Sequence, residues 1–265
     1  MKTFKTISIA LCLALCSAII FGCKNGAQTK DQAPQEKAPE AQVDQAQVPE
    51  HYSVPAELQY AQEETYQAGD QTYPLYIIDK FYPIGWSKDG KLAYIEEPAD
   101  EAVGAYFFQF HILDLNTGKD VFTWKPEEDP EEGSISQMCQ DNKELFESKL
   151  KENGIIPQTF KLEGVEVPFI AENAKVWMDK TPTESNFLGC DVIKNVKVSC
   201  GTPKENKVIF EDENNEEYNT TLNQDIAGTL KFPYGDMAAV MVKSTQRGYE
   251  GPPHVYHFYF VKASK

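Results

Sequence analysis

The chain has 265 residues, of which 41 are acidic and 25 are basic, so its formal charge at neutral pH is −16. This acid excess argues against binding to nucleic acid and against adhesion to anionic lipid surfaces, because both depend on clustered lysine and arginine side chains. The stretch from residue 56 to residue 265 is long enough for one domain, or two small ones, with a substantial core.

The first 22 residues have the parts of a secretory signal. Lys2 and Lys5 precede an unbroken apolar run over residues 7–21, which is shorter than the roughly 20 residues that a membrane-spanning helix needs. Where this run ends, the residues Ile20-Phe21-Gly22-Cys23 resemble the lipobox of bacterial lipoproteins. A signal peptide cleaved elsewhere and an uncleaved anchor are the alternative interpretations.

The lipoprotein resemblance implies a processing route and a location. Residues 1–22 would be removed, diacylglycerol would be attached to Cys23 through a thioether, and the new amino group would be acylated, for example with palmitate. Several acyl chains together anchor a protein firmly in a membrane. Loss of Lys2 and Lys5 would leave 23 basic and 41 acidic side chains, a formal charge of −18.

Lys24 follows the cysteine, where many inner-membrane lipoproteins of two-membrane bacteria carry aspartate. The resemblance therefore implies an exported cell envelope protein in the outer membrane. Its globular domain would lie in the periplasm or at the cell surface.

Residues 23–55 are expected to form a lipidated, disordered tether. They are dominated by Gln, Ala, Glu, Asp, Lys and Pro, with prolines at positions 34, 39, 49 and 55. This composition cannot bury enough apolar surface to offset chain entropy, and the prolines exclude a coiled-coil stalk. A flexible chain of this length would hold the domain roughly 30 Å from the membrane on average.

Residues 56–265 are predicted to form a single β-rich globular domain. Helical spacing of apolar residues after a Ser134–Gln137 capping box predicts one central amphipathic helix over residues 134–153. Alternating apolar residues predict strands over residues 75–78, 82–86, 92–96, 105–115, 121–124, 160–162, 165–170, 175–178, 190–200, 207–210, 218–222, 229–232, 238–243 and 255–261. We therefore expect an α+β fold of mainly antiparallel sheet, with a two-sheet sandwich as one arrangement.

The first strands of this domain carry a turn motif. Residues 85–94 read Gly-Trp-Ser-Lys-Asp-Gly-Lys-Leu-Ala-Tyr, and Ile112-Leu113-Asp114-Leu115 with Thr117-Gly118 follows. Together these residues resemble one blade of the periplasmic TolB-type propeller repeats, in which the Asp-Gly turn is structural. A propeller needs about four or more blades and the motif occurs once, so we do not expect a full propeller.

If residues 1–22 are removed, three cysteines remain besides Cys23, and two of them could form a disulfide. An exported chain can form disulfides, yet an odd count leaves at least one thiol free. Cys190 and Cys200 could face each other across a turn, but the three valines between them, at positions 192, 196 and 198, fall on even positions like the cysteines themselves. This favours one long strand and predicts no bridge between the two residues, with Cys139 as the third thiol.

The loop before the last strand gathers the only arginine of the chain with other polar groups. Arg247, Tyr249, Glu250 and His254 could together bind an anionic or sugar-like ligand. The alternative is a hairpin stiffened by glycine and proline and held by an internal Arg247–Glu250 pair, which we favour. This loop, the Trp-Ser-x-Asp-Gly region and the central helix are similar to an uncharacterised family of predicted secreted bacterial proteins, which implies export but no chemistry.

Signatures of enzymes are missing from the sequence. It has no Gly-x-Ser-x-Gly, no His-Glu-x-x-His, no phosphate-binding glycine loop, no dinucleotide fingerprint and no zinc-ligand spacing. We therefore expect no catalytic residue, no metal and no cofactor, and the leading hypothesis is a non-catalytic module that binds an envelope protein partner. The alternative is a receptor for a small molecule, an ion or a glycan. A hydrolase comes third, because a catalytic pair of acids needs no local motif.

Overall fold

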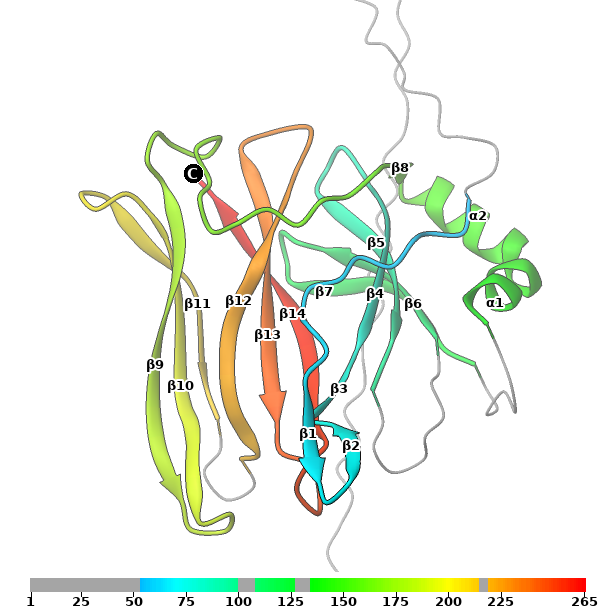
Figure 1. Cartoon of the computed structure of the whole chain (residues 1–265). Coiled ribbons are helices and arrows are strands. Elements are labelled where there is room, and N and C mark those ends of the chain that lie inside the picture. The colour runs from blue at the N-terminus through cyan, green and yellow to red at the C-terminus, as the bar shows by residue number, and fades with distance from the viewer. Residues whose placement is uncertain (1–52, 100–107, 127–133, 215–218) are drawn as a thin grey trace, which may run out of the picture. The chain divides into compact units, whose positions relative to one another are not determined.

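The structure is a computed structural model that describes residues 53–99, 108–126, 134–214 and 219–265, all within one compact unit. Three sheets and a pair of helices follow one another as layers (Figure 1). The predicted fold class is confirmed, because the described chain is mainly antiparallel β with a small helical part and does not close into a propeller. The expected sandwich is present, with a third sheet added to it.

The middle layer, here called the central sheet, is buried on both faces. Its strands, in spatial order, are β12 (Thr221–Lys231), β13 (Met237–Gln246), β14 (His254–Ser264) and β3 (Tyr76–Ile78). All neighbours pair antiparallel except β14 and β3, which are parallel. In β13, Met237, Ala239 and Met241 face one core while Val240 and Val242 face the other, as the two-residue period of a strand requires.

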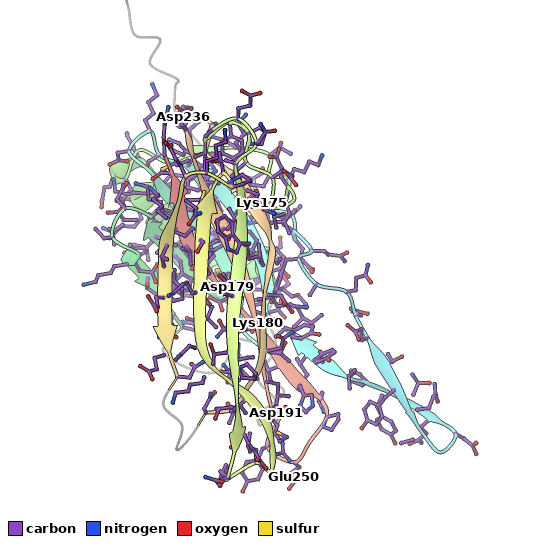
Figure 2. The ribbon with its side chains drawn as sticks, turned by 90° about the vertical axis from the view of Figure 1, so that its left-hand side faces the viewer. Lys175, Asp179, Lys180, Asp191, Asp236 and Glu250 are labelled. Atoms are coloured by element: carbon purple, nitrogen blue, oxygen red, sulfur yellow. The ribbon has the colours of Figure 1, made fainter. Side chains whose placement is uncertain are left out.

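An outer sheet covers one face of the central sheet. It consists of β9 (Lys175–Ser185), β10 (Cys190–Gly201) and β11 (Asn206–Glu213), with β10 in the middle. Figure 2 shows charged side chains such as Lys175, Asp179 and Asp191 on these strands. The predicted long strand from Cys190 is confirmed as β10, and no disulfide joins Cys190 to Cys200.

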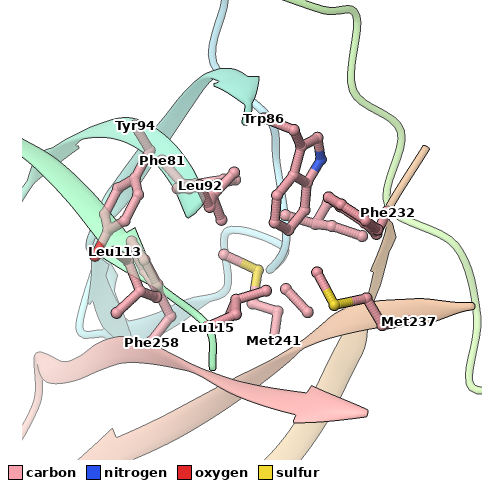
Figure 3. Close-up of a cluster of buried hydrophobic side chains, with 12 residues drawn as sticks. Phe81, Trp86, Leu92, Tyr94, Leu113, Leu115, Phe232, Met237, Met241 and Phe258 are labelled. Carbon is pink, nitrogen blue, oxygen red and sulfur yellow. The ribbon is translucent and has the colours of Figure 1, made fainter. Parts of the chain in front are cut away.

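A meander sheet covers the other face of the central sheet. Its strands, in spatial order, are β7 (Lys119–Trp124), β6 (Gln109–Asp114), β5 (Lys91–Glu97), β4 (Lys80–Trp86) and β8 (Ile156–Pro157). The predicted turn at Gly90 is confirmed, with a φ of 95° that favours glycine. Phe81, Trp86 and Leu92 from this sheet meet Met241 and Phe258 from the central sheet in one core (Figure 3). Each of these fully buried side chains stabilises the fold by roughly 1.5–3 kcal/mol.

Two helices form the last layer. The single helix predicted over residues 134–153 is divided into α1 (Ile135–Asp141) and α2 (Lys143–Glu152). The break falls at Asn142, whose φ of −109° and ψ of 15° depart from the helix, and whose side-chain amide and main-chain N–H both donate to the Met138 carbonyl, at 3.0 and 3.1 Å. Ser134 caps α1 by accepting from the Gln137 N–H at 3.2 Å, as predicted, and Phe146 of α2 stacks on Phe110 of the meander sheet.

Several strand predictions are corrected by the structure. Residues 160–162 form no strand, and residues 165–170 form only an isolated bridge at Glu166, because their apolar side chains fill gaps in two cores without pairing as strands. The strand predicted over residues 229–232 is the end of β12. Residues 105–107 and 218 of the predicted strands lie outside the described residues, as do residues 1–52, including Cys23 and most of the predicted tether.

A short hairpin of β1 (Thr65–Ala68) and β2 (Gln71–Pro74) was not predicted. Figure 2 shows this cyan hairpin projecting from the stacked sheets. It pairs with no other strand, and its most visible packing is the stack of Tyr66 on Tyr73, whose ring centroids are 5.8 Å apart. The hairpin connects the first described segment to β3, and residues on both sides of it line one hollow of the domain.

Candidate functional site

A cleft of about 310 Å³ opens between residues 57–65 and β3 with the two residues after it. Its walls are acidic, aromatic and aliphatic. They comprise Glu57, Gln59, Tyr60, Ala61, Glu63, Glu64, Thr65, Pro74, Tyr76, Ile77, Ile78, Asp79 and Lys80. We call this hollow the tyrosine cleft, because Tyr60 contributes from the first segment and Tyr76 from the strand opposite.

Two main-chain hydrogen bonds hold the ends of the cleft together. The Leu58 N–H donates to the Phe81 carbonyl at 2.8 Å, and the Leu75 N–H donates to the Glu64 carbonyl at 2.8 Å. Between these anchors, no main-chain hydrogen bond joins residues 59–63 to another segment within the described ranges. The stretch is therefore fixed at both ends and unpaired in its middle, which leaves the cleft open.

Tyr60 connects the cleft to the buried core. Its hydroxyl donates to the Tyr256 carbonyl at 3.2 Å, and its ring packs edge-on against Phe258 with the centroids 5.4 Å apart. Burial raises the pKa of the Tyr60 hydroxyl well above its ordinary value, and the charges of Asp79 and Glu96 raise it further. Tyr60 therefore stays neutral and serves as a hydrogen-bond donor in this position.

Tyr76 belongs to an aromatic stack that already holds a cation. The rings of Tyr76 and Tyr256 are parallel within 16°, with centroids 4.0 Å apart. The Lys243 ammonium lies 4.1 Å from the Tyr256 centroid. Since both neighbours are about 4 Å from the same ring, they must occupy its opposite faces. The Lys243 ammonium and the Tyr76 ring thus lie on opposite faces of the Tyr256 ring, and Tyr76 also lines the cleft.

The acidic groups of the cleft outnumber its basic groups. Lys80 is the only lysine of the wall, and its ammonium pairs with Glu97 at 3.1 Å. No ion pair or side-chain hydrogen bond engages Glu57, Glu63 or Glu64 in the described part of the chain, and all three are exposed. The cleft thus presents carboxylates that are free to meet a solute.

The fourth acid of the wall, Asp79, is already satisfied. Only 1% of this residue is exposed, and its carboxylate accepts a hydrogen bond from the Ala99 N–H at 2.7 Å. The other oxygen lies 2.9 Å from His257 Nδ1. This hydrogen bond raises the pKa of His257, and its imidazolium form neutralises the buried carboxylate.

His111, Glu96 and Asp120 form a second group of an imidazole and carboxylates. His111 Nδ1 is 2.9 Å from Asp120 Oδ2, and His111 Nε2 is 3.6 Å from Glu96 Oε2. Burial raises the pKa of Glu96 to about 7, and the charge of Asp79 adds to this effect. Glu96 does not line the cleft, so this group can hold a proton inside the fold but does not face a solute there.

The loop singled out from the sequence is braced by its own contacts. The Arg247 guanidinium donates to the Leu188 carbonyl at 3.1 Å, which ties the loop to the turn between β9 and β10. The Gly248 N–H donates to His254 Nδ1 at 3.1 Å, Tyr249 is 92% exposed, and Glu250 lies at the loop tip (Figure 2). None of the four residues lines the tyrosine cleft, and among the described ion pairs none joins Arg247 to Glu250.

One residue of that loop contacts a residue of the cleft wall. The His254 ring is tilted against the Tyr76 ring, with centroids 6.1 Å apart, and the His254 N–H donates to the Leu75 carbonyl at 2.8 Å. Sequence reasoning singled out His254, which does not line the cleft, and it missed the cleft itself. The signal available was the joint presence of tyrosines and glutamates in residues 57–76, which lacks strand or helix periodicity.

Other classes of site are not evident in the described residues. No group of three His, Cys, Asp or Glu side chains there is placed to hold a metal ion. None of the described helices is long and apolar enough to cross a bilayer. Comparison with models of known families, with curated proteins and with solved structures found no match.

Proposed function

We propose that this chain is a lipid-anchored protein of the bacterial cell envelope whose β-rich domain is a non-catalytic binding module. The tyrosine cleft is the observation that carries the binding part of the proposal. Its volume of about 310 Å³ lies at the lower end of the range for small-molecule sites, roughly 300–1,000 Å³. Its wall combines rings and aliphatic side chains, which can bury the apolar part of a ligand, with charged and polar side chains, which can orient it.

The anchoring part of the proposal rests on the N-terminal pattern. Lys2 and Lys5, the apolar run and Cys23 resemble a lipoprotein signal, and the composition of residues 24–55 suits a tether. The cleft begins at Glu57, two residues after the predicted tether ends. Outer-membrane placement is part of the same proposal, because Lys24 stands where aspartate would favour the inner membrane.

Intact mass and detergent partitioning test the anchoring part. The full chain is expressed in a bacterial host as wild type and as Cys23→Ala. We expect the wild-type protein to begin at Cys23, to carry acyl mass and to enter the detergent phase, and the variant to lose all three properties. Wild-type protein released without acyl mass would contradict the anchor.

A ligand screen with a blocked cleft tests the binding part. Gln59→Trp places a large side chain on the cleft wall, while Gln67→Trp makes the same change at an exposed position of β1 outside the wall. The screen measures thermal shifts with amines, carboxylic acids, sugars and short peptides. We expect ligands that stabilise the wild type and Gln67→Trp but not Gln59→Trp. If no compound separates the two variants, the cleft is not a binding site.

A further inference from the structure

We propose that the tyrosine cleft binds an ammonium group carried on a short aliphatic chain. This inference rests on the proposed function, because it names the class of ligand for the same cleft. A free diamine and the side chain of a lysine share this chemistry. Charge, ring faces and aliphatic wall each support it separately.

The first support is the charge of the cleft. Glu57, Glu63 and Glu64 are exposed acceptors without a cationic partner in the described chain, and Lys80 is held by Glu97. Carboxylates that converge on one hollow attract a cation and repel an anion, and a low-dielectric wall strengthens this effect. An anionic ligand is therefore excluded from the cleft, in contrast to the loop at Arg247.

The second support is the aromatic stack. Lys243 shows that this stack accepts an ammonium at 4.1 Å from the centroid of Tyr256. Tyr256 covers one face of Tyr76, while Tyr76 itself lines the cleft from the far end of the stack. A second ammonium in the cleft could contact the electron-rich ring of Tyr76 in the manner of Lys243.

The third support is the aliphatic part of the wall. Ala61, Pro74, Ile77 and Ile78 line the same hollow as the acids and the rings. These side chains can remove the methylene groups of an aliphatic amine from water, which is favourable in proportion to the apolar area buried. A neutral alcohol of the same length would gain this term and could donate to the glutamates, but it would gain neither the Coulomb attraction nor the contact with the ring.

The experiment is calorimetric titration of the full chain in uncharged detergent with cadaverine and with 1,5-pentanediol, its neutral counterpart. A second pair of probes is a Gly-Lys-Gly peptide with blocked ends and the same peptide acetylated at the lysine Nε. We expect both charged probes to bind about ten-fold or more tightly than their neutral counterparts. Binding of cadaverine alone would assign the site to free amines, and tighter binding of the lysine peptide would assign it to a protein ligand.

Variants with equal charge separate the cleft from the general acidity of the chain. The cleft variant is Glu57→Gln/Glu63→Gln/Glu64→Gln, and we expect it to weaken cadaverine binding about ten-fold. The control is Glu172→Gln/Glu184→Gln/Glu205→Gln, which changes three exposed glutamates outside the cleft and should weaken binding less than about two-fold. Equal losses in the two variants would mean diffuse attraction and would overturn the proposal.

The ring contact has its own pair of variants. Tyr76→Leu should weaken cadaverine binding by about two- to five-fold, whereas Tyr76→Phe keeps the ring face and should bind nearly as wild type does. If neutral or anionic compounds from the screen bind and are lost in Gln59→Trp, the cleft remains a binding site but the ammonium inference is wrong. If no compound depends on the cleft, the proposed function itself fails.

Discussion

Asp79 and His257 form an ion pair although 178 residues separate them in the chain, with 2.9 Å between Asp79 Oδ2 and His257 Nδ1. The two partners differ in burial, because 1% of the aspartate side chain and 43% of the histidine side chain are exposed. Asp79 follows β3 and His257 lies in β14, so the pair adds a side-chain link beside the only parallel pairing of the central sheet. Asp79 also lines the tyrosine cleft.

This difference in burial predicts unequal costs for the two single substitutions. His257→Ala leaves a buried carboxylate without its cation, and we expect a loss of about 3 kcal/mol in the free energy of unfolding. Asp79→Asn leaves a half-exposed imidazole that can release its proton, and we expect a loss of about 1 kcal/mol. Urea unfolding at pH 6 measures both losses, and the opposite order would contradict the assignment of Asp79 as the buried partner.

The same pair predicts how stability changes with pH. The Asp79 hydrogen bond raises the pKa of His257 above its ordinary value of 6.5 in the folded state. The stabilisation is therefore complete below about pH 6.5 and is lost as the pH rises through the folded-state pKa. In urea unfolding at several pH values, the difference between wild type and Asp79→Asn should shrink from pH 6 to pH 9. A difference that grows with pH would refute it.

The raised pKa of Glu96 predicts a second loss of stability with rising pH, at lower pH than the loss that involves His257. Its pKa is raised from 4.5 to about 7 on folding, so the folded state binds more protons than the unfolded state between these values. The free energy of unfolding should fall by up to about 3 kcal/mol as the pH rises from 4.5 to 7. Glu96→Gln should remove this slope and be more stable than the wild type at pH 8. Glu184→Gln, at an exposed position of β9, should keep the wild-type slope.

Local patterns predicted the strands that bury alternate side chains, and they failed where packing is not periodic. The side chains of β5 point alternately into two cores, and so the sequence of this segment indicates a strand. The hairpin of β1 and β2 has mostly exposed side chains and no such period. The chain leaves the helical conformation at Asn142, where its side chain also bonds to the Met138 carbonyl, and the spacing of apolar residues cannot reveal such a local change.

The candidate site was less predictable than the fold for a physical reason. The tyrosine cleft forms where residues 57–65, which have no regular structure before Thr65, cross β3. Asp79 acquires its partner His257 only through the parallel pairing of β3 with β14. Nothing local in the sequence encodes this pairing. His254 was singled out in a loop with Arg247, and its ring, besides accepting from Gly248 of that loop, lies against Tyr76.

Gly85 allows β8 to approach β4 closely. A single methyl group added at this position should therefore lower the free energy of unfolding. A Cβ atom at this position would lie 2.3 Å from the Ile156 carbonyl oxygen and 2.9 Å from the Pro157 Cα. Both are main-chain atoms, so β8 must shift, and we expect Gly85→Ala to lower the free energy of unfolding by about 2 kcal/mol. Gly164→Ala is the control, because nothing lies within 4 Å of the added atom there. Urea unfolding of both variants tests the prediction, and equal stabilities would contradict the close approach.

Substitution of Arg247 tests whether its side chain stabilises the last loop or takes part in ligand binding. Its guanidinium donates to the Leu188 carbonyl at 3.1 Å, while its main-chain N–H donates to the Thr220 carbonyl at 2.8 Å. Only the first bond depends on the side chain, so Arg247→Met should lower the free energy of unfolding by about 1 kcal/mol. Its affinity for cadaverine should stay within about two-fold of the wild type, because Arg247 does not line the cleft. Wild-type stability together with altered ligand binding would instead return the binding site to the loop of Arg247, Tyr249 and Glu250.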